Sequence, residues 1–159
     1  MGKYIAKVKE FHDTFEHPVL EKPTIPAERI ELRIRLLEEE LGELKEAIQK
    51  GDLVEVADAF CDLQYVLSGA ILEFGMKDVF DDMFDEVHRS NMTKACTSSK
   101  EVHDTGVMYK DLGVEAITKV IVSNGEPKVI FLRKGDKKLL KNKYYEKANL
   151  KQFIDNVQM

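Results

Sequence analysis

The chain has 159 residues, of which 43% are apolar and 33% are charged, with 24 lysines and arginines against 29 aspartates and glutamates. At about 150 residues per domain, this length predicts one domain with a small appendage at most. The net charge of −5 disfavours a nucleic-acid polymer as partner, because proteins that bind nucleic acids usually present a basic face. The longest apolar-rich stretch, 57–74, is interrupted by Asp58, Asp62 and Glu73, which excludes a membrane-spanning helix.

The cysteine content and the N-terminal segment both bear on location. Only two cysteines occur, Cys61 and Cys96, and Cys61 lies in an apolar run, so nothing indicates a disulfide framework. The first ten residues lack the apolar core of a secretory signal. We therefore expect a reducing, cytoplasmic location.

Apolar periodicity predicts four helices before residue 96. The first covers 3–16, and prolines then prevent 17–26 from being continuously helical. The second covers 27–49 and is stopped by Gly51, after which Asp52 is placed to cap a third helix over 53–74. This third helix is apolar around most of its circumference, so we expect it to be central. A fourth helix begins near Asp78 and ends between 89 and 94, and the short turns predict an antiparallel arrangement.

The C-terminal third has a different character. Residues 97–105 are polar and are expected to form a loop. Two β-branched runs, 116–123 and 128–133, flank Asn124 and Gly125, which predicts a β-hairpin. A basic tail follows, with a short helix possible at 149–157. We expect 1–96 to form an all-α core and 97–159 to form an extension of the same domain.

Carboxylates recur at helical spacing on two consecutive predicted helices, so that each set lies on one side of its helix. On the second helix they are Glu39, Glu40 and Glu43, and on the third helix they are Glu55, Asp58 and Asp62. If the stripes faced each other, like charges about 4 Å apart would repel by about 4 kcal/mol per pair. A divalent cation would relieve this repulsion, and carboxylate ligands favour Mg²⁺ or Mn²⁺ over zinc. The alternatives are a structural acidic patch and a solvated helix face.

Several neighbouring residues have two interpretations. Asp62 lies in a segment that we expect to be buried, where it would be either a metal ligand or the partner of a cation such as Arg89 or Lys94. Arg33 and Arg35, just before the glutamates, could pair with them or reach a phosphate, and we expect the pairing. Phe60 and Tyr65 line either a nucleobase pocket or, more commonly for helical aromatics, the core.

The acidic pattern resembles a known superfamily. Glu39-Glu40-Leu41-Gly42-Glu43, followed by Glu55-Val56-Ala57-Asp58, is similar to the motif of the all-α nucleoside triphosphate pyrophosphohydrolases, which include the MazG-like enzymes. The segment 84–94 resembles a motif of the phosphoribosyl-ATP-pyrophosphohydrolase-like branch, and 136–150 loosely resembles its C-terminal segment. The resemblance covers most of 27–96, and the hairpin near 116–133 departs from it.

The resemblance implies a four- to five-helix bundle completed by dimerisation or tetramerisation, with 1–96 as the catalytic core. It implies Mg²⁺-dependent hydrolysis of a nucleotide between the α and β phosphates, giving a monophosphate and pyrophosphate. Glu40, Glu43, Glu55 and Asp58 would be metal ligands, Glu39 a further ligand or the base that activates water, and Asp62 an additional ligand. Phosphate or nucleotide contacts would come from the remaining polar candidates, which are Arg89, Asn91, Lys94, Lys138, Lys141 and Tyr145. The alternatives are that Arg89 and Lys94 complement a helix C-terminus and that the basic tail is a solvated surface.

Two other functions compete with hydrolysis. One is a regulatory protein on the same fold that binds metal or nucleotide with little turnover. The other is a structural helical oligomer whose acidic stripe faces solvent. Mg²⁺-dependent stabilisation would separate these two, because only a protein that binds the metal in its folded state is stabilised by it.

Overall fold

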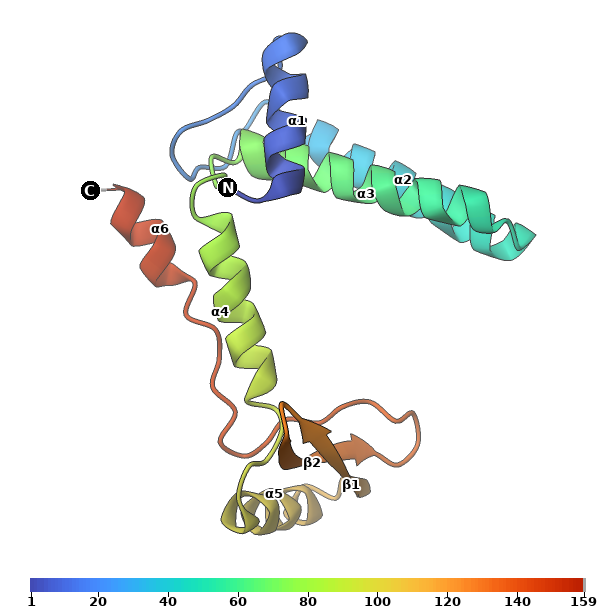
Figure 1. The fold of residues 1–159 in the computed structure, drawn as a ribbon, viewed down its shortest axis with the longest axis vertical. Helices are drawn as coiled ribbons and strands as arrows, with labels where there is room; N and C mark the ends of the chain where they lie inside the picture. The colour runs from blue at the N-terminus through green and yellow to red at the C-terminus, as the bar shows by residue number, and fades with distance from the viewer. Residues whose placement is uncertain (159) are drawn as a thin grey trace. The chain divides into compact units, whose positions relative to one another are not determined.

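The computed structural model describes residues 1–158, which divide into two compact units (Figure 1). The first unit, Met1–Met83 with the C-terminal helix, contains α1 (Lys3–Thr14), α2 (Ile30–Lys50), α3 (Leu53–Glu73) and α6 (Lys151–Gln158). The second, Phe84–Leu150, contains α5 (Ser99–Asp111) and the strands β1 (Ala116–Ser123) and β2 (Glu126–Arg133). Helix α4 (Phe80–Met92) begins in the first unit and ends in the second.

The mainly helical fold with a C-terminal hairpin confirms the expected fold class. The four helices predicted before residue 96 are present, and their ends differ from the expected ones by at most three residues. The short helix expected at 149–157 is present as α6. None of the helices within residues 1–158 is long and apolar enough to cross a membrane.

Helices α2 and α3 form an antiparallel helical hairpin (Figure 1). Gly51 ends α2 in the left-handed conformation, with φ of 70°, which a residue without Cβ adopts at little cost. Asp52 then caps α3, as expected, since its Oδ1 accepts hydrogen bonds from the backbone N–H groups of Val54 (3.0 Å) and Glu55 (3.2 Å). This two-residue connection brings the two acidic stripes onto neighbouring helices.

The core of the first unit lies at the C-terminal end of α3. Ile5 and Val8 of α1 pack there against Ile71 and Leu72. Because α3 packs against both α1 and α2, its central position within this unit is confirmed. The segment around Asp62, residues 60–66, was expected to be buried, and this is wrong for a single chain. Phe60 is 58% exposed and Asp62 is only half-buried. The apolar core packs against the other end of α3, which leaves the segment around residue 60 open.

A buried network of ion pairs lies at the same end of α3. The Glu73 side chain has no solvent exposure, and its Oε1 accepts hydrogen bonds from Arg33 at 2.5 Å and Arg29 at 2.7 Å. Burial alone would raise the pKa of Glu73, but the hydrogen bonds from Arg33 and Arg29 lower it to about 2. The buried ring of His12 lies beside this network, with Nε2 3.3 Å from Arg33 and Nδ1 2.8 Å from the Pro18 carbonyl oxygen.

The second unit contains a helix where a loop was expected. The prediction for 97–105 is wrong, because α5 begins at Ser99 and Ser98 caps it by accepting a hydrogen bond from the Glu101 N–H at 3.2 Å. The segment is polar because only a narrow face of α5 is buried. On that face Tyr109 packs with Cys96 and with Phe131 of the hairpin.

The predicted hairpin is present, with β1 and β2 antiparallel and Ser123 opposite Glu126. Asn124 and Gly125 form the connection with φ of 54° and 80°, the sign that a type I′ turn requires. Val129 of β2 also exchanges two backbone hydrogen bonds with Cys96, at 2.8 and 3.0 Å. The hairpin is therefore tied to the segment that follows α4.

Candidate active site

The two acidic stripes meet along the packed faces of α2 and α3. Glu40 of α2 and Asp62 of α3 are half-buried, whereas the other four predicted ligands are exposed. Burial raises the pKa of Glu40 above its usual value, and neighbouring carboxylates raise it further. In decreasing order of their effect on this pKa, the neighbours are Asp62, Glu43, Glu39 and Asp58. Five of the six predicted ligands therefore share one region.

Glu55, the sixth predicted ligand, lies in an adjoining hollow on α3. Asp58 lines the same hollow, together with Val54, Ala57 and Cys61. Asp58 thus connects this hollow with the region around Glu40. All six residues lie on the α2–α3 hairpin within the first unit.

The donor set fits a hard divalent cation in its chemistry. Every candidate is a carboxylate, the ligand type that Mg²⁺ and Mn²⁺ prefer, and four of them lie near Glu40. Within residues 1–158, however, no three His, Cys, Asp or Glu side chains are already grouped to hold a metal ion. The carboxylates are neighbours, and metal binding would have to draw them together.

Asp62 has no basic partner within the described part of the first unit. Among residues 1–158, no lysine or arginine side chain forms an ion pair with Asp62. The proposed structural partners belong to the second unit, where Arg89 pairs with glutamates and Lys94 donates a hydrogen bond to Asn91 at 2.6 Å. Which of the two interpretations of Asp62 holds stays a prediction, and we favour the metal ligand.

The comparisons with known proteins identify the family of this chain. The sequence profile of the family described as phosphoribosyl-ATP pyrophosphohydrolase matches residues 8–91, more than half of the chain. The chain belongs to the phosphoribosyl-ATP pyrophosphohydrolase family. The match spans most of α1, all of α2 and α3 and most of α4, and it includes all six predicted metal ligands.

A viral protein shows similarity over nearly the whole chain. It is an uncharacterized protein of Acanthamoeba polyphaga mimivirus, 24% identical over 240 aligned positions that cover 93% of this chain and 94% of the relative. Membership of the phosphoribosyl-ATP pyrophosphohydrolase family indicates a hydrolase that acts on pyrophosphate bonds of nucleotides. The hairpin and tail lie outside the part that matches the family.

The predicted phosphate contacts at the end of α4 are paired within the second unit. The Arg89 guanidinium lies 2.7 Å from Glu86 and 2.6 Å from Glu146, and Asn91 accepts the hydrogen bond from Lys94. These cations also lie near the C-terminal end of α4, where positive charge stabilises a helix. These glutamates accept three of the five N–H donors of the Arg89 guanidinium, so two remain for a phosphate.

The three predicted contacts in the tail are also in the second unit. Lys138 is exposed, and Lys141 Nζ lies 4.5 Å from the centre of the Tyr145 ring. The Tyr145 hydroxyl accepts a hydrogen bond from Ser90 Oγ at 3.0 Å, which ties the tail to α4. The role of these residues in nucleotide binding stays a prediction.

The expected pairing of Arg33 with the glutamates of its own helix is wrong. Arg33 is buried and pairs with Glu73 on α3. Arg29 and Arg33 are four residues apart and so project from the same side of the chain entering α2. That spacing, with a glutamate at the end of an apolar helix, is the signal that sequence reasoning missed.

Proposed function

We propose that this member of the family is a Mg²⁺-dependent nucleotide pyrophosphohydrolase that cleaves between the α and β phosphates. The observation that supports this most directly is that half-buried Glu40 lies among four other carboxylates contributed by α2 and α3. Crowded carboxylates of this kind repel one another unless a cation lies between them. A nucleoside triphosphate is itself anionic, so it too needs a cation to approach them.

The residues of the α2–α3 hairpin have distinct roles in this proposal. Glu40, Glu43, Glu55, Asp58 and Asp62 would hold the metal. When bound, Mg²⁺ would screen the phosphate charge and lower the pKa of a water molecule. Glu39, which is exposed beside this group, accepts the proton from the attacking water. The water oxygen bonds to phosphorus as the anhydride bond breaks, and pyrophosphate leaves.

The test is product analysis with a panel of nucleoside triphosphates. We expect a nucleoside monophosphate and pyrophosphate in equal amounts with Mg²⁺, and none with a chelator. Release of orthophosphate and a diphosphate would contradict cleavage at the α–β bond. Mg²⁺-dependent stabilisation without any turnover would instead support the regulatory alternative.

We also propose that two chains associate through the open faces of α2 and α3. Ile34, Leu41 and Ile48 lie seven residues apart on α2 and are exposed, so that they form one apolar stripe. Leu53 and Val54 of α3 are exposed as well. A contiguous apolar surface of this kind usually marks an interface, and a second copy of the hairpin would match it in length and character.

Sedimentation measures this association directly. We expect a dimer or a tetramer at micromolar concentration, and Leu41→Glu should shift it toward monomer because it buries a charge in the interface. Lys45→Glu, one turn further along α2 at an exposed polar position, is the matched control. A wild-type monomer near 18.2 kDa would contradict the proposal.

A further inference from the structure

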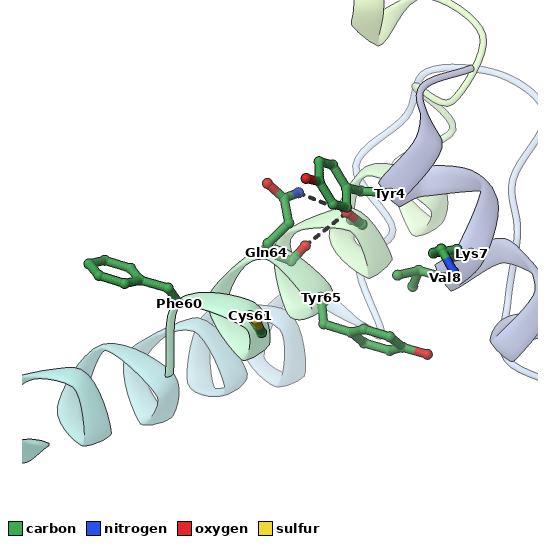
Figure 2. A pocket seen from close by; sticks show the side chains of 8 residues that line it. Tyr4, Lys7, Val8, Phe60, Cys61, Gln64 and Tyr65 are labelled. Atoms are coloured by element: carbon green, nitrogen blue, oxygen red, sulfur yellow. Dashed lines mark hydrogen bonds between the residues drawn. The ribbon is translucent and has the colours of Figure 1, made fainter. Parts of the chain in front are cut away.

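A pocket of about 360 Å³ lies between α1 and α3 in the first unit (Figure 2). Its volume is within the range of small-molecule sites. Two helices supply its walls: Tyr4, Lys7 and Val8 come from α1, and Phe60, Cys61, Gln64, Tyr65 and Ser68 come from α3. We call this the α1–α3 pocket.

Aromatic rings make up much of the α1–α3 pocket. Tyr4 faces it from α1, and Phe60 and Tyr65 flank it on α3 (Figure 2). The Tyr65 ring is held from outside the pocket by an edge-on contact with Phe11, at 5.6 Å between ring centres and 85° between planes. A flat, unsaturated ligand suits such walls, because aromatic rings stack on one another or meet edge to face.

One polar group within these walls is fixed in place. Gln64 Nε2 donates a hydrogen bond to Ser68 Oγ at 3.0 Å, and that hydroxyl donates to the backbone carbonyl of Gln64 at 2.8 Å. No residue within 1–158 donates a hydrogen bond to Gln64 Oε1. The amide therefore offers an acceptor, and a second N–H beside it, to whatever enters. Nucleobases carry the matching pair of adjacent donor and acceptor on one edge.

The α1–α3 pocket adjoins the acidic region. Cys61 lines both this pocket and the hollow that holds Glu55 and Asp58. Asp58 precedes Cys61 by three residues and Tyr65 follows it by four, so the three lie on one side of α3. Asp58 and Tyr65 are therefore about 10 Å apart along the helix axis. A ligand seated against Tyr65 could extend its phosphates toward the carboxylates.

We propose that the α1–α3 pocket receives the base of the nucleotide substrate, with Tyr4 and Tyr65 against the ring and Gln64 bonded to its polar edge. This inference rests on the proposed function, and it makes Gln64 the residue that reads the base. A second copy of the chain is the other possible occupant. Its apolar side chains would leave the Gln64 amide without a partner in a closed pocket, which costs free energy, so we favour the base.

The thiol of Cys61 reports on this pocket without any need for turnover. Cys61 is exposed and lines the pocket, whereas Cys96 is 1% exposed in the second unit, so a thiol reagent such as dithiobis-nitrobenzoate reacts first at Cys61. Nucleosides without phosphate are then added in the absence of Mg²⁺. At about ten times the Kd of a nucleoside we expect about a tenfold slower reaction, because about a tenth of the pockets stay empty. Ribose should have no effect.

Substitutions test whether the protection of Cys61 by nucleosides depends on the Gln64 amide. Gln64→Leu should abolish protection by nucleosides while leaving the reaction rate of Cys61 without nucleoside unchanged. Gln49→Leu, at an exposed position of α2, is the matched control and should behave as wild type. Cys61→Ser should remove the fast phase, which verifies the assignment of the thiol.

Two results would overturn the base pocket. One is turnover of triphosphates by the wild type with no protection of Cys61 by any nucleoside. The other is a Cys61 reaction that slows as protein concentration rises and ignores nucleosides, which would assign the pocket to a second copy. Protection by a nucleoside without pyrophosphate release would instead support the pocket and contradict the proposed hydrolysis.

Discussion

Glu40 on α2 lies close to Asp62 on α3, and both carboxyl groups are half-buried. Burial raises the pKa of Glu40, and Asp62 is the neighbouring charge that raises it most. Two carboxylates from different helices are thus held together with no basic side chain paired to Asp62 within residues 1–158. This relationship is the physical basis of the metal site that we propose, and it makes the site testable without substrate.

Glu40→Gln should abolish turnover and weaken Mg²⁺ binding, while the metal-free protein melts no lower than wild type. The amide keeps the shape of the side chain but removes one charge from a repelling group. Asp58→Asn should behave in the same way. Calorimetric melts with and without Mg²⁺ measure both effects, with Glu46→Gln as a control, since Glu46 pairs with Lys50 on the surface. Activity retained at saturating Mg²⁺ would remove the residue from the ligand set.

Asp62→Asn separates a metal ligand from a structural carboxylate. We expect unchanged or higher stability without metal, weaker Mg²⁺ binding and slower turnover. If Asp62 instead paired with a buried cation, the substitution would lower the free energy of unfolding by about 3–5 kcal/mol, because the cation would stay buried without a partner. A Mg²⁺ titration and a melt on the same sample decide between these. A large loss of metal-free stability with unchanged Mg²⁺ affinity would leave the metal to the other five residues.

Glu73→Gln should destabilise the fold by about 3–5 kcal/mol, because it leaves Arg29 and Arg33 beside a buried neutral group. Urea unfolding at neutral pH measures this loss. Because hydrogen bonds from the two arginines lower the pKa of buried Glu73 to about 2, its contribution to stability is present above its usual pKa. The contribution should be lost as the pH falls from there toward about 2. Equal acid sensitivity in Glu73→Gln and wild type would contradict this.

His12 should make the stability of the first unit depend on pH near neutrality. Burial lowers the pKa of His12 below its usual value of 6.5, and the charge of Arg33 lowers it further. The folded state therefore binds fewer protons than the unfolded state, so stability is full above the usual pKa and falls as the pH drops through it.

Urea unfolding of wild type and His12→Gln between about pH 8 and about pH 5 measures this dependence. The wild type should lose more stability than the variant over that interval. His103→Gln, at an exposed position of α5, should follow the wild type. Parallel curves for wild type and His12→Gln would exclude His12 as the titrating group.

Local sequence determined most of the elements and the candidate ligands. Apolar residues at helical spacing predicted α2 and α3, and Asp52 was predicted to cap α3. Asn124-Gly125 predicted the hairpin. These features could be predicted because each depends on residues that are neighbours in the chain. The same spacing brought each acidic stripe onto one side of its helix. Helix α5 could not be predicted from apolar spacing, because few of its residues are apolar. The face of α5 that carries Tyr109 is buried only because the hairpin packs on it.

Only the tertiary structure decided which side chains become partners. Arg33 pairs with Glu73, forty positions away, in place of the glutamates on its own helix. The pKa of Glu40 is raised by burial between the helices and then by Asp62 across the hairpin. The α1–α3 pocket likewise joins residues more than fifty positions apart. Charge and burial depend on distances through space, and the packing of α1, α2 and α3 sets those distances.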